Sequence, residues 1–163
     1  LALSATAIVW SVSARVGADR YMYHEAGQNA KLLLDTISAG RIYEALELKK
    51  AEVSRQLTGT NLKEYYDGVP EEERHAIDEF LDNQVTKEVI AAGPTADWQF
   101  AKGDGVTRYE NQTFVIVDMA NRSVQGGKQQ VRVRMRRQTE MMTDPTKRDS
   151  TALWNFESLT SPE

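Results

Sequence analysis

The spacing of apolar residues changes along the chain, from helical in the first part to alternating in the last. Apolar residues recur at i, i+3, i+4 and i+7 at Ala30, Leu33, Leu34 and Ile37. Gly40 follows this stretch, where a residue in the left-handed conformation can end a helix. No strong helix breaker stands earlier in the chain. The pattern therefore predicts one helix from near Leu1 to about Ser38, with Gly17 or Gly27 as places where it can bend.

The beginning of this helix is uncharged. Residues 1–14 contain no Asp, Glu, Lys or Arg, and their apolar side chains include those of Leu3, Ile8, Val9 and Trp10. At a rise of 1.5 Å per residue the run covers roughly 21 Å, whereas a bilayer core measures about 30 Å. Tyrosines and arginines follow it, as they do at a membrane interface. The run predicts a membrane anchor that further apolar residues upstream would complete; a buried core helix and a signal-peptide segment are the alternatives.

Shorter helices are predicted after this long one. The first covers residues 42–48 and the second is a single turn at 62–66. Pro70 suits the first position of a third helix, and Glu71, Glu72 and Glu73 then lie in its first turn, where the helix dipole favours carboxylates. The buried side of this third helix is formed by Ile77, Phe80 and Leu81. A last short helix covers residues 85–92 and ends at Gly93-Pro94.

After Pro94 the pattern is that of strands. Residues 130–138 alternate most clearly, with Val131, Val133 and Met135 on one face and Arg132, Arg134 and Arg136 on the other. Three further strands are predicted: one beginning near Trp98, one over 112–119, and one over 151–159 that has Trp154 and Phe156 on one face. Turns are predicted at Gly103-Asp104-Gly105 and at Gly126-Gly127. Helices first and strands last predict an α+β fold, with a long N-terminal helix and short helices packed on a mainly antiparallel four-stranded sheet.

The stretch AKLLLDTISAGRIYEALELKKAEV resembles the opening helices of NTF2-like (cystatin-like) domains. In these domains a helix that ends in small residues and a glycine leads into a Y-x-x-A segment, here 30–40 and 43–46. The likeness extends over 29–159. It implies a curved sheet wrapped on a helix around a conical cavity, and it implies no single activity. We therefore expect residues 1–25 to be a transmembrane and juxtamembrane helix, and residues 26–163 to be the NTF2-like domain.

Composition narrows the possible chemistry. The 163 residues carry a formal net charge of -4, which gives no overall attraction to nucleic acid. There is no cysteine, which excludes disulfides, thiolate metal sites and a cysteine nucleophile. The two histidines, His24 and His75, stand in contexts typical of a helix surface. No catalytic, cofactor-binding or metal-binding residue is assigned from the sequence, and no cofactor is expected.

The strongest local charge is the row of Arg132, Arg134 and Arg136 on one face of its strand. In one interpretation these side chains face solvent and pair with Asp118, Glu140 or Glu157 of neighbouring strands. In the others, the row contacts an acidic protein partner, lipid headgroups or a nucleic acid backbone. Trp98, Phe100, Phe114 and the two aromatics of the last strand are either core or the lining of a ligand cavity. Asn111 and Asn121 begin glycosylation-like triplets, which arise readily by chance.

These features lead to a first functional expectation. The chain is expected to be a membrane-anchored, non-enzymatic accessory or structural subunit that contacts other membrane-protein subunits and, through its N-terminal helix, membrane lipid. Likeness to anchored NTF2-like proteins of the bacterial cell envelope places it in the inner membrane, with the extracytoplasmic side favoured for the domain. The alternative is a domain that uses the cone to bind a small ligand or to act as a hydrolase or isomerase.

Overall fold

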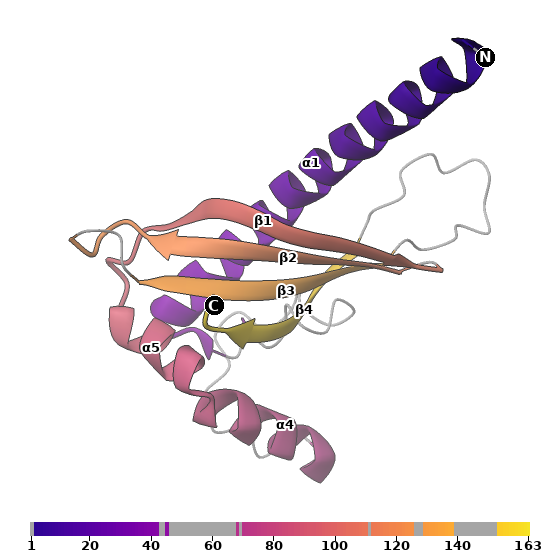
Figure 1. Ribbon diagram of the computed structural model, residues 1–163. Helices are drawn as coiled ribbons and strands as arrows, with labels where there is room; N and C mark the ends of the chain where they lie inside the picture. Colours follow the sequence, from indigo (N-terminus) through magenta and orange to yellow (C-terminus); the bar gives the residue numbers. More distant parts are fainter. Residues whose placement is uncertain are drawn as a thin grey trace, which may run out of the picture.

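The structure is a computed structural model that describes residues 2–42, 45, 68, 70–110, 112–125, 129–138 and 153–163. Three helices, α1 (Ala2–Ser38), α4 (Glu71–Asp82) and α5 (Gln84–Ala92), precede four strands, β1 (Trp98–Tyr109), β2 (Gln112–Asn121), β3 (Gln130–Gln138) and β4 (Leu153–Thr160). The strands form one curved antiparallel sheet in the order β1-β2-β3-β4. The second half of α1 crosses one face of the sheet, and α5 and α4 continue from one end of it (Figure 1). The predicted α+β fold is confirmed.

One helix extends from Ala2 to Ser38, as the sequence predicts. Its C-terminus is closed by hydrogen bonds from the Gly40 N–H to the Ile37 carbonyl at 3.0 Å and from the Arg41 N–H to the Thr36 carbonyl at 3.1 Å. Gly40 has φ 79°, the left-handed conformation that this closure requires and that glycine adopts without strain. The first part of α1 projects beyond the sheet, while the second part lies against it (Figure 1).

The two short helices begin and end at residues with clear local causes. Pro70 is the N-cap of α4, with ψ 149°, so the prediction that it occupies the first helical position is wrong by one residue. Glu71, Glu72 and Glu73 do lie in the first turn. Asn83 separates α4 from α5, because its Oδ1 accepts the Val85 N–H at 2.9 Å and the Thr86 N–H at 3.2 Å.

The predicted turn at Gly103-Asp104-Gly105 is wrong, because these residues lie inside β1. The pairing of β1 with β2 has irregularities between Phe100 and Lys102 and between Gly103 and Gly105, where φ of Gly105 is 150°. Glycines at this place produce bulges that bend the strand without reversing it. Several sequence predictions concern positions outside the described residues. These are the helix at 42–48, except for residues 42 and 45, the helix at 62–66, and the single positions Asn111, Gly126, Gly127 and Glu140.

The core lies between α1, α5 and the inner face of the sheet. The strand residues predicted to face inward, Val131, Val133 and Met135, are all buried, and their neighbours on β2 are Val115, Val117 and Met119. From α1 the core receives Ala26, Ala30, Leu33, Leu34 and Ile37. Phe156 is buried and Trp154 packs half-buried beside it, which confirms the predicted inner face of β4. Phe100 and Phe114 are not core residues, since Phe100 is exposed and Phe114 lies half-buried on the outer face.

A buried hydrogen-bond chain joins the three layers of this core. The Trp98 indole N–H donates to the Ser38 hydroxyl at 2.8 Å, and that hydroxyl donates to the Val89 carbonyl at 3.2 Å. Trp98 is fully buried, so its N–H needs an internal partner. The chain therefore fixes the end of α1 relative to both β1 and α5.

We expect Met135→Ala to lower the free energy of unfolding by about 2–5 kcal/mol, because it removes a buried side chain from the centre of β3. The matched control is Arg134→Ala on the adjacent, outward-facing position, which should cost less than about 1 kcal/mol. Urea unfolding of both variants measures the difference. A similar small loss for both would show that the inner face of β3 is not part of a packed core.

Candidate functional site

The row of Arg132, Arg134 and Arg136 lies on the outer face of the sheet, and Arg132 contacts the buried carboxylate of Asp118. Asp118 is only 1% exposed, and Arg132 Nε and a terminal nitrogen of Arg132 lie 2.8 and 3.2 Å from its two carboxylate oxygens. A second carboxylate, that of Asp104, lies 2.6 Å from the same guanidinium. The hydrogen bond to Asp118 raises the pKa of Arg132 above its usual value. Arg132 therefore neutralises a buried carboxylate.

The other two arginines of the row have different surroundings. Arg136 Nε lies 3.1 Å from a carboxylate oxygen of Glu157 on β4. Arg134 lies over the ring of Phe114, with 4.7 Å between its guanidinium carbon and the ring centroid. Pairing with Asp118 and Glu157 is what the solvent-facing interpretation predicts. Arg134 is exposed and, among the residues that the structure describes, is the member of the row without a carboxylate partner.

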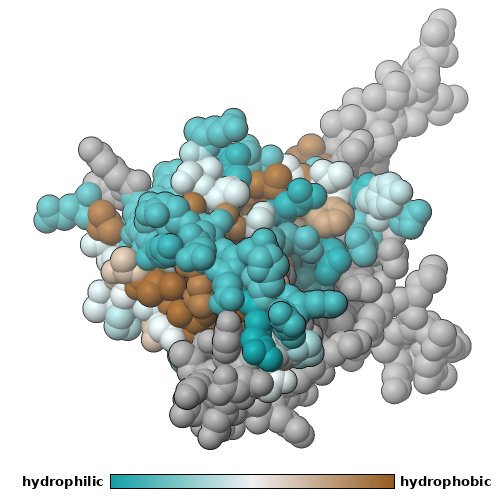
Figure 2. Space-filling view, turned by 90° about the horizontal axis from the view of Figure 1, so that it is seen from below, coloured by the Kyte–Doolittle hydropathy of each residue, from teal (hydrophilic) through white to brown (hydrophobic). Residues whose placement is uncertain are grey.

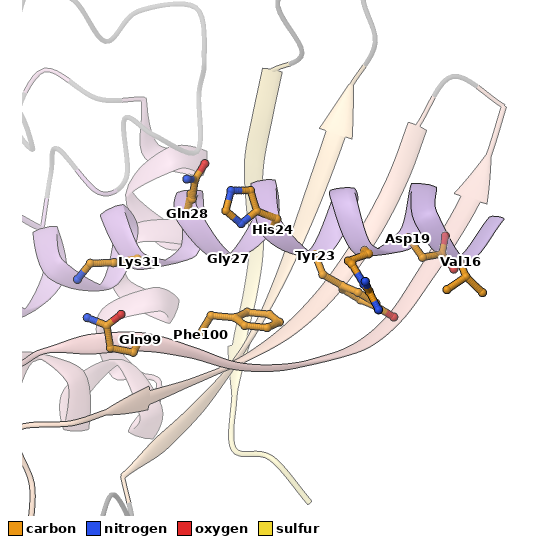
Figure 3. A pocket seen from close by; sticks show the side chains of 10 residues that line it. Val16, Asp19, Tyr23, His24, Gly27, Gln28, Lys31, Gln99 and Phe100 are labelled. Carbon is orange, nitrogen blue, oxygen red and sulfur yellow. The ribbon is translucent and has the colours of Figure 1, made fainter. Parts of the chain in front are cut away.

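A groove lies between α1 and the edge strand β1. It has a volume of about 650 Å³ and is lined from α1 by residues between Val16 and Lys31 and from β1 by Gln99 and Phe100. Figure 3 shows Tyr23 and Phe100 in the space between the helix and β1, with His24 and Gln28 on another side of the helix. Volumes of this order are typical of small-molecule sites, so we call this the α1–β1 groove and treat it as the candidate site.

Two glycines determine how closely α1 approaches β1. A Cβ at Gly103 would lie 2.3 Å from Cδ1 of Tyr23, and a Cβ at Gly27 would lie 2.9 Å from Cδ2 of Phe100. Each glycine thus receives an aromatic ring from the opposite element. The Tyr23 ring therefore packs on β1 at Gly103. Phe100 packs over Gly27, is 42% exposed, and forms part of the groove lining.

The charged side chains of the groove differ in whether they are paired. Asp19 forms an ion pair with Arg108 of β1. Lys31 lies 3.0 Å from both the Asp35 carboxylate and the Trp98 carbonyl. Arg20 and His24 have no partner among the described residues, although both line the groove. The groove therefore has one cation and one imidazole available to a ligand.

A second polar cluster joins α1 to the other end of the sheet. Glu25 accepts hydrogen bonds from the Tyr21 hydroxyl and, at 3.3 Å, from the Trp154 indole N–H, and Arg137 Nε lies 3.5 Å away. The hydrogen bond to Glu25 raises the pKa of Tyr21 above its ordinary value. Both carboxylate oxygens of Glu25 are thus engaged, and the cluster holds α1 against β3 and β4.

The remaining candidates from the sequence do not form a reactive arrangement in the described part of the chain. His75 is exposed and lies 3.4 Å from Glu79 of its own helix, while His24 lies in the groove on α1. No group of three or more potential metal ligands occurs among the described residues. Asn121 is 1% exposed. Its Nδ2 donates a hydrogen bond to Gln129 Oε1 at 2.8 Å, and its Oδ1 accepts one from the Asp97 N–H at 3.1 Å. The side chain therefore caps the end of a strand and is not accessible for glycosylation.

Comparison of the chain with protein-family models, curated proteins and solved structures found no match. The resemblance to NTF2-like domains therefore stays a prediction, and the function has to be argued from the geometry above. Sequence patterns did not indicate the α1–β1 groove, because its walls come from a helix and a strand far apart in the chain. Gly27 and Gly103 were the only local signals, and neither shows which ring it receives.

We expect Gly103→Ala to destabilise the protein by about 1–3 kcal/mol, because the added methyl group overlaps the Tyr23 ring. In a Tyr23→Ala background most of this penalty should disappear, giving a coupling of about 0.5–3 kcal/mol in a double-mutant cycle measured by urea unfolding. Gly17→Ala is the control: nothing lies within 4 Å of its added Cβ, so helix propensity should make it neutral or stabilising. An unchanged Gly103→Ala penalty in the Tyr23→Ala background would refute the contact.

Proposed function

We propose that the chain is a membrane-anchored, non-enzymatic accessory or structural subunit that acts through protein contacts in a larger membrane assembly. The observation that carries this proposal is the continuity of α1, a single helix of 37 residues. Its beginning contains the uncharged run with Ile8, Val9 and Trp10, and its second half supplies Leu33, Leu34 and Ile37 to the core. An anchor built this way holds the domain at a fixed position relative to the bilayer.

Within the described residues, no helix is both long enough and apolar enough to cross a membrane. We propose that the uncharged run at the beginning of α1 belongs to the membrane anchor. Arg20 and Tyr21, which are both exposed, then lie at the interface, where arginine and tyrosine side chains are favoured. Seen from below, the coloured surface is mainly hydrophilic, with a hydrophobic area at the lower left and smaller hydrophobic spots elsewhere (Figure 2). A mainly hydrophilic surface suits a domain outside the bilayer.

The contacts of the charged side chains support a role in protein binding more than a role in catalysis. Glu25 is engaged at both oxygens, Asp118 is matched by Arg132, and Asp19 is matched by Arg108. General acid–base work needs a group within reach of a substrate proton, and these carboxylates are committed to holding elements together. Arg134 is exposed on the outer face and available to an acidic partner. The bacterial inner membrane, with the domain on its extracytoplasmic side, is the location that we propose.

We expect the full-length protein to sediment with membranes, and the double variant Ile8→Asp/Val9→Asp to appear largely in the soluble fraction after an alkaline wash. An aspartate at the centre of a span costs about 2.5–3.5 kcal/mol, so two aspartates within the uncharged run should strongly disfavour insertion. The matched control is Leu32→Asp/Val124→Asp, which places the same charges on two exposed apolar positions of the domain and should leave the protein in the membrane. A soluble wild-type protein, or a double variant that stays in the membrane, would contradict the anchor.

We expect Arg134→Glu to weaken the complex that the protein forms when it is purified from native membranes in mild detergent. Charge reversal on an exposed contact lowers the association rate and removes its salt dependence. Arg132 is unsuitable for this test, because its loss removes the two-point contact with the buried Asp118 carboxylate and would disturb the fold as well as the surface. Arg122→Glu on the exposed β2–β3 turn is the control. A protein that migrates as a lone monomer, or a complex indifferent to Arg134→Glu, argues against the proposed function.

A further inference from the structure

The wall of the α1–β1 groove changes its chemistry in a fixed order along α1. Val16, Arg20, His24 and Gln28 follow one another at intervals of four residues and all line the groove. Each residue lies about 6 Å further along the helix axis than the one before and is turned by about 40° around it, so neighbouring members of the series lie side by side. From the uncharged beginning of α1 toward the sheet, the wall is first apolar, then cationic, then an imidazole donor, and finally an amide.

The other residues of the groove lining add aromatic surface and more polar groups. Tyr23 and Phe100 line the groove from α1 and β1, and Gln99 and Lys31 lie at the end furthest from the uncharged run (Figure 3). Val16 is 55% exposed at the opposite end. The groove is therefore open toward the uncharged part of α1 and has amide and ammonium groups at its other end.

The charge that the groove offers to a ligand is positive. Asp19 is paired with Arg108, and Lys31 with Asp35, whereas Arg20 and His24 have no partner in the described part of the chain. An arginine and a histidine one helical turn apart can both donate hydrogen bonds to the same phosphate group. The unpaired groups of the groove are thus complementary to an anion.

We infer that the α1–β1 groove binds an anionic phospholipid of the bilayer. The phosphate lies beside Arg20 and His24, and the hydroxylated headgroup extends along α1 toward the Gln28 amide. The acyl chains leave past Val16 along the uncharged beginning of α1. The order of the groove wall, apolar, cationic and amide, follows the order of acyl chain, phosphate and hydroxyl groups in such a lipid. This inference rests on the proposed function, because the acyl chains reach the bilayer only if the beginning of α1 lies in it.

The test uses the full-length chain in neutral detergent and measures binding of dihexanoyl phosphatidylglycerol by calorimetry. Wild-type protein should bind this lipid at least about tenfold more tightly than dihexanoyl phosphatidylcholine, a change of about 1.4 kcal/mol. The variant Arg20→Gln/His24→Gln should lose at least about tenfold in affinity for the anionic lipid. The matched control Arg122→Gln/His75→Gln makes the same two replacements on exposed positions outside the groove and should bind as wild type does.

Each other outcome overturns the inference in a recognisable way. If Arg20→Gln/His24→Gln bound dihexanoyl phosphatidylglycerol as tightly as wild type does, the groove would not be the binding site. If wild-type protein bound dihexanoyl phosphatidylcholine equally tightly, the negative charge of the headgroup would not be recognised. Glycerol 3-phosphate binding as tightly as the lipid would identify a soluble phosphate ester as the ligand. Because the short-chain lipid is presented without a bilayer, its binding is measured separately from membrane sedimentation. Failure of the anchor and failure of the lipid site are therefore distinguishable.

Discussion

Small residues bring α1 close to the sheet, and this close approach determines both the core and the surface of the molecule. Ala26 and Ala30 are fully buried where the helix crosses the inner face, and Gly27 and Gly103 each accept an aromatic ring from the other element. The Trp98–Ser38 hydrogen bond then fixes the end of the helix. Because α1 is held along this length, the part that projects beyond the sheet has a defined direction (Figure 1). The α1–β1 groove exists for the same reason, since Phe100 lies over Gly27 and not in the core.

The outer face of the sheet shows why a row of like charges is a poor guide to a binding surface. Arg132 forms a two-point contact with Asp118, which is buried beneath it, and Arg136 lies beside Glu157. Removing a cation from beside a buried carboxylate costs more free energy than an exposed ion pair contributes. The contact between Arg132 and Asp118 therefore stabilises the fold itself. Arg134 differs because its guanidinium is stacked on Phe114 and its hydrogen-bond donors stay available on the surface. Of three equivalent positions in the sequence, the structure thus leaves one suited to recognition.

The sequence was informative wherever one element alone decides the outcome. Alternation along β3 placed Val131, Val133 and Met135 inward, and the helical spacing with Gly40 gave the extent of α1. It failed at Gly103-Asp104-Gly105, because two glycines are typical of either a reversal or a bulge, and only the pairing with β2 on both sides shows that the strand continues. It also gave no indication of the Glu25 cluster, in which side chains from α1, β3 and β4 meet. Contacts between distant segments leave no periodic pattern in the chain.

The proposed anchor, lipid site and partner surface occupy different parts of the molecule. The groove lies along α1, which crosses the inner face of the sheet, whereas Arg134 points from the outer face of β3. A lipid held beside Arg20 and His24 would contact the helix just where it leaves the bilayer, so it would add to the anchor without covering the arginine surface. Between them stands a core in which α1 and β3 are both buried, with Leu34 and Val133 fully enclosed. The projecting first part of α1 and the buried second part belong to one continuous helix, Ala2–Ser38, so no loop separates the proposed anchor from the core.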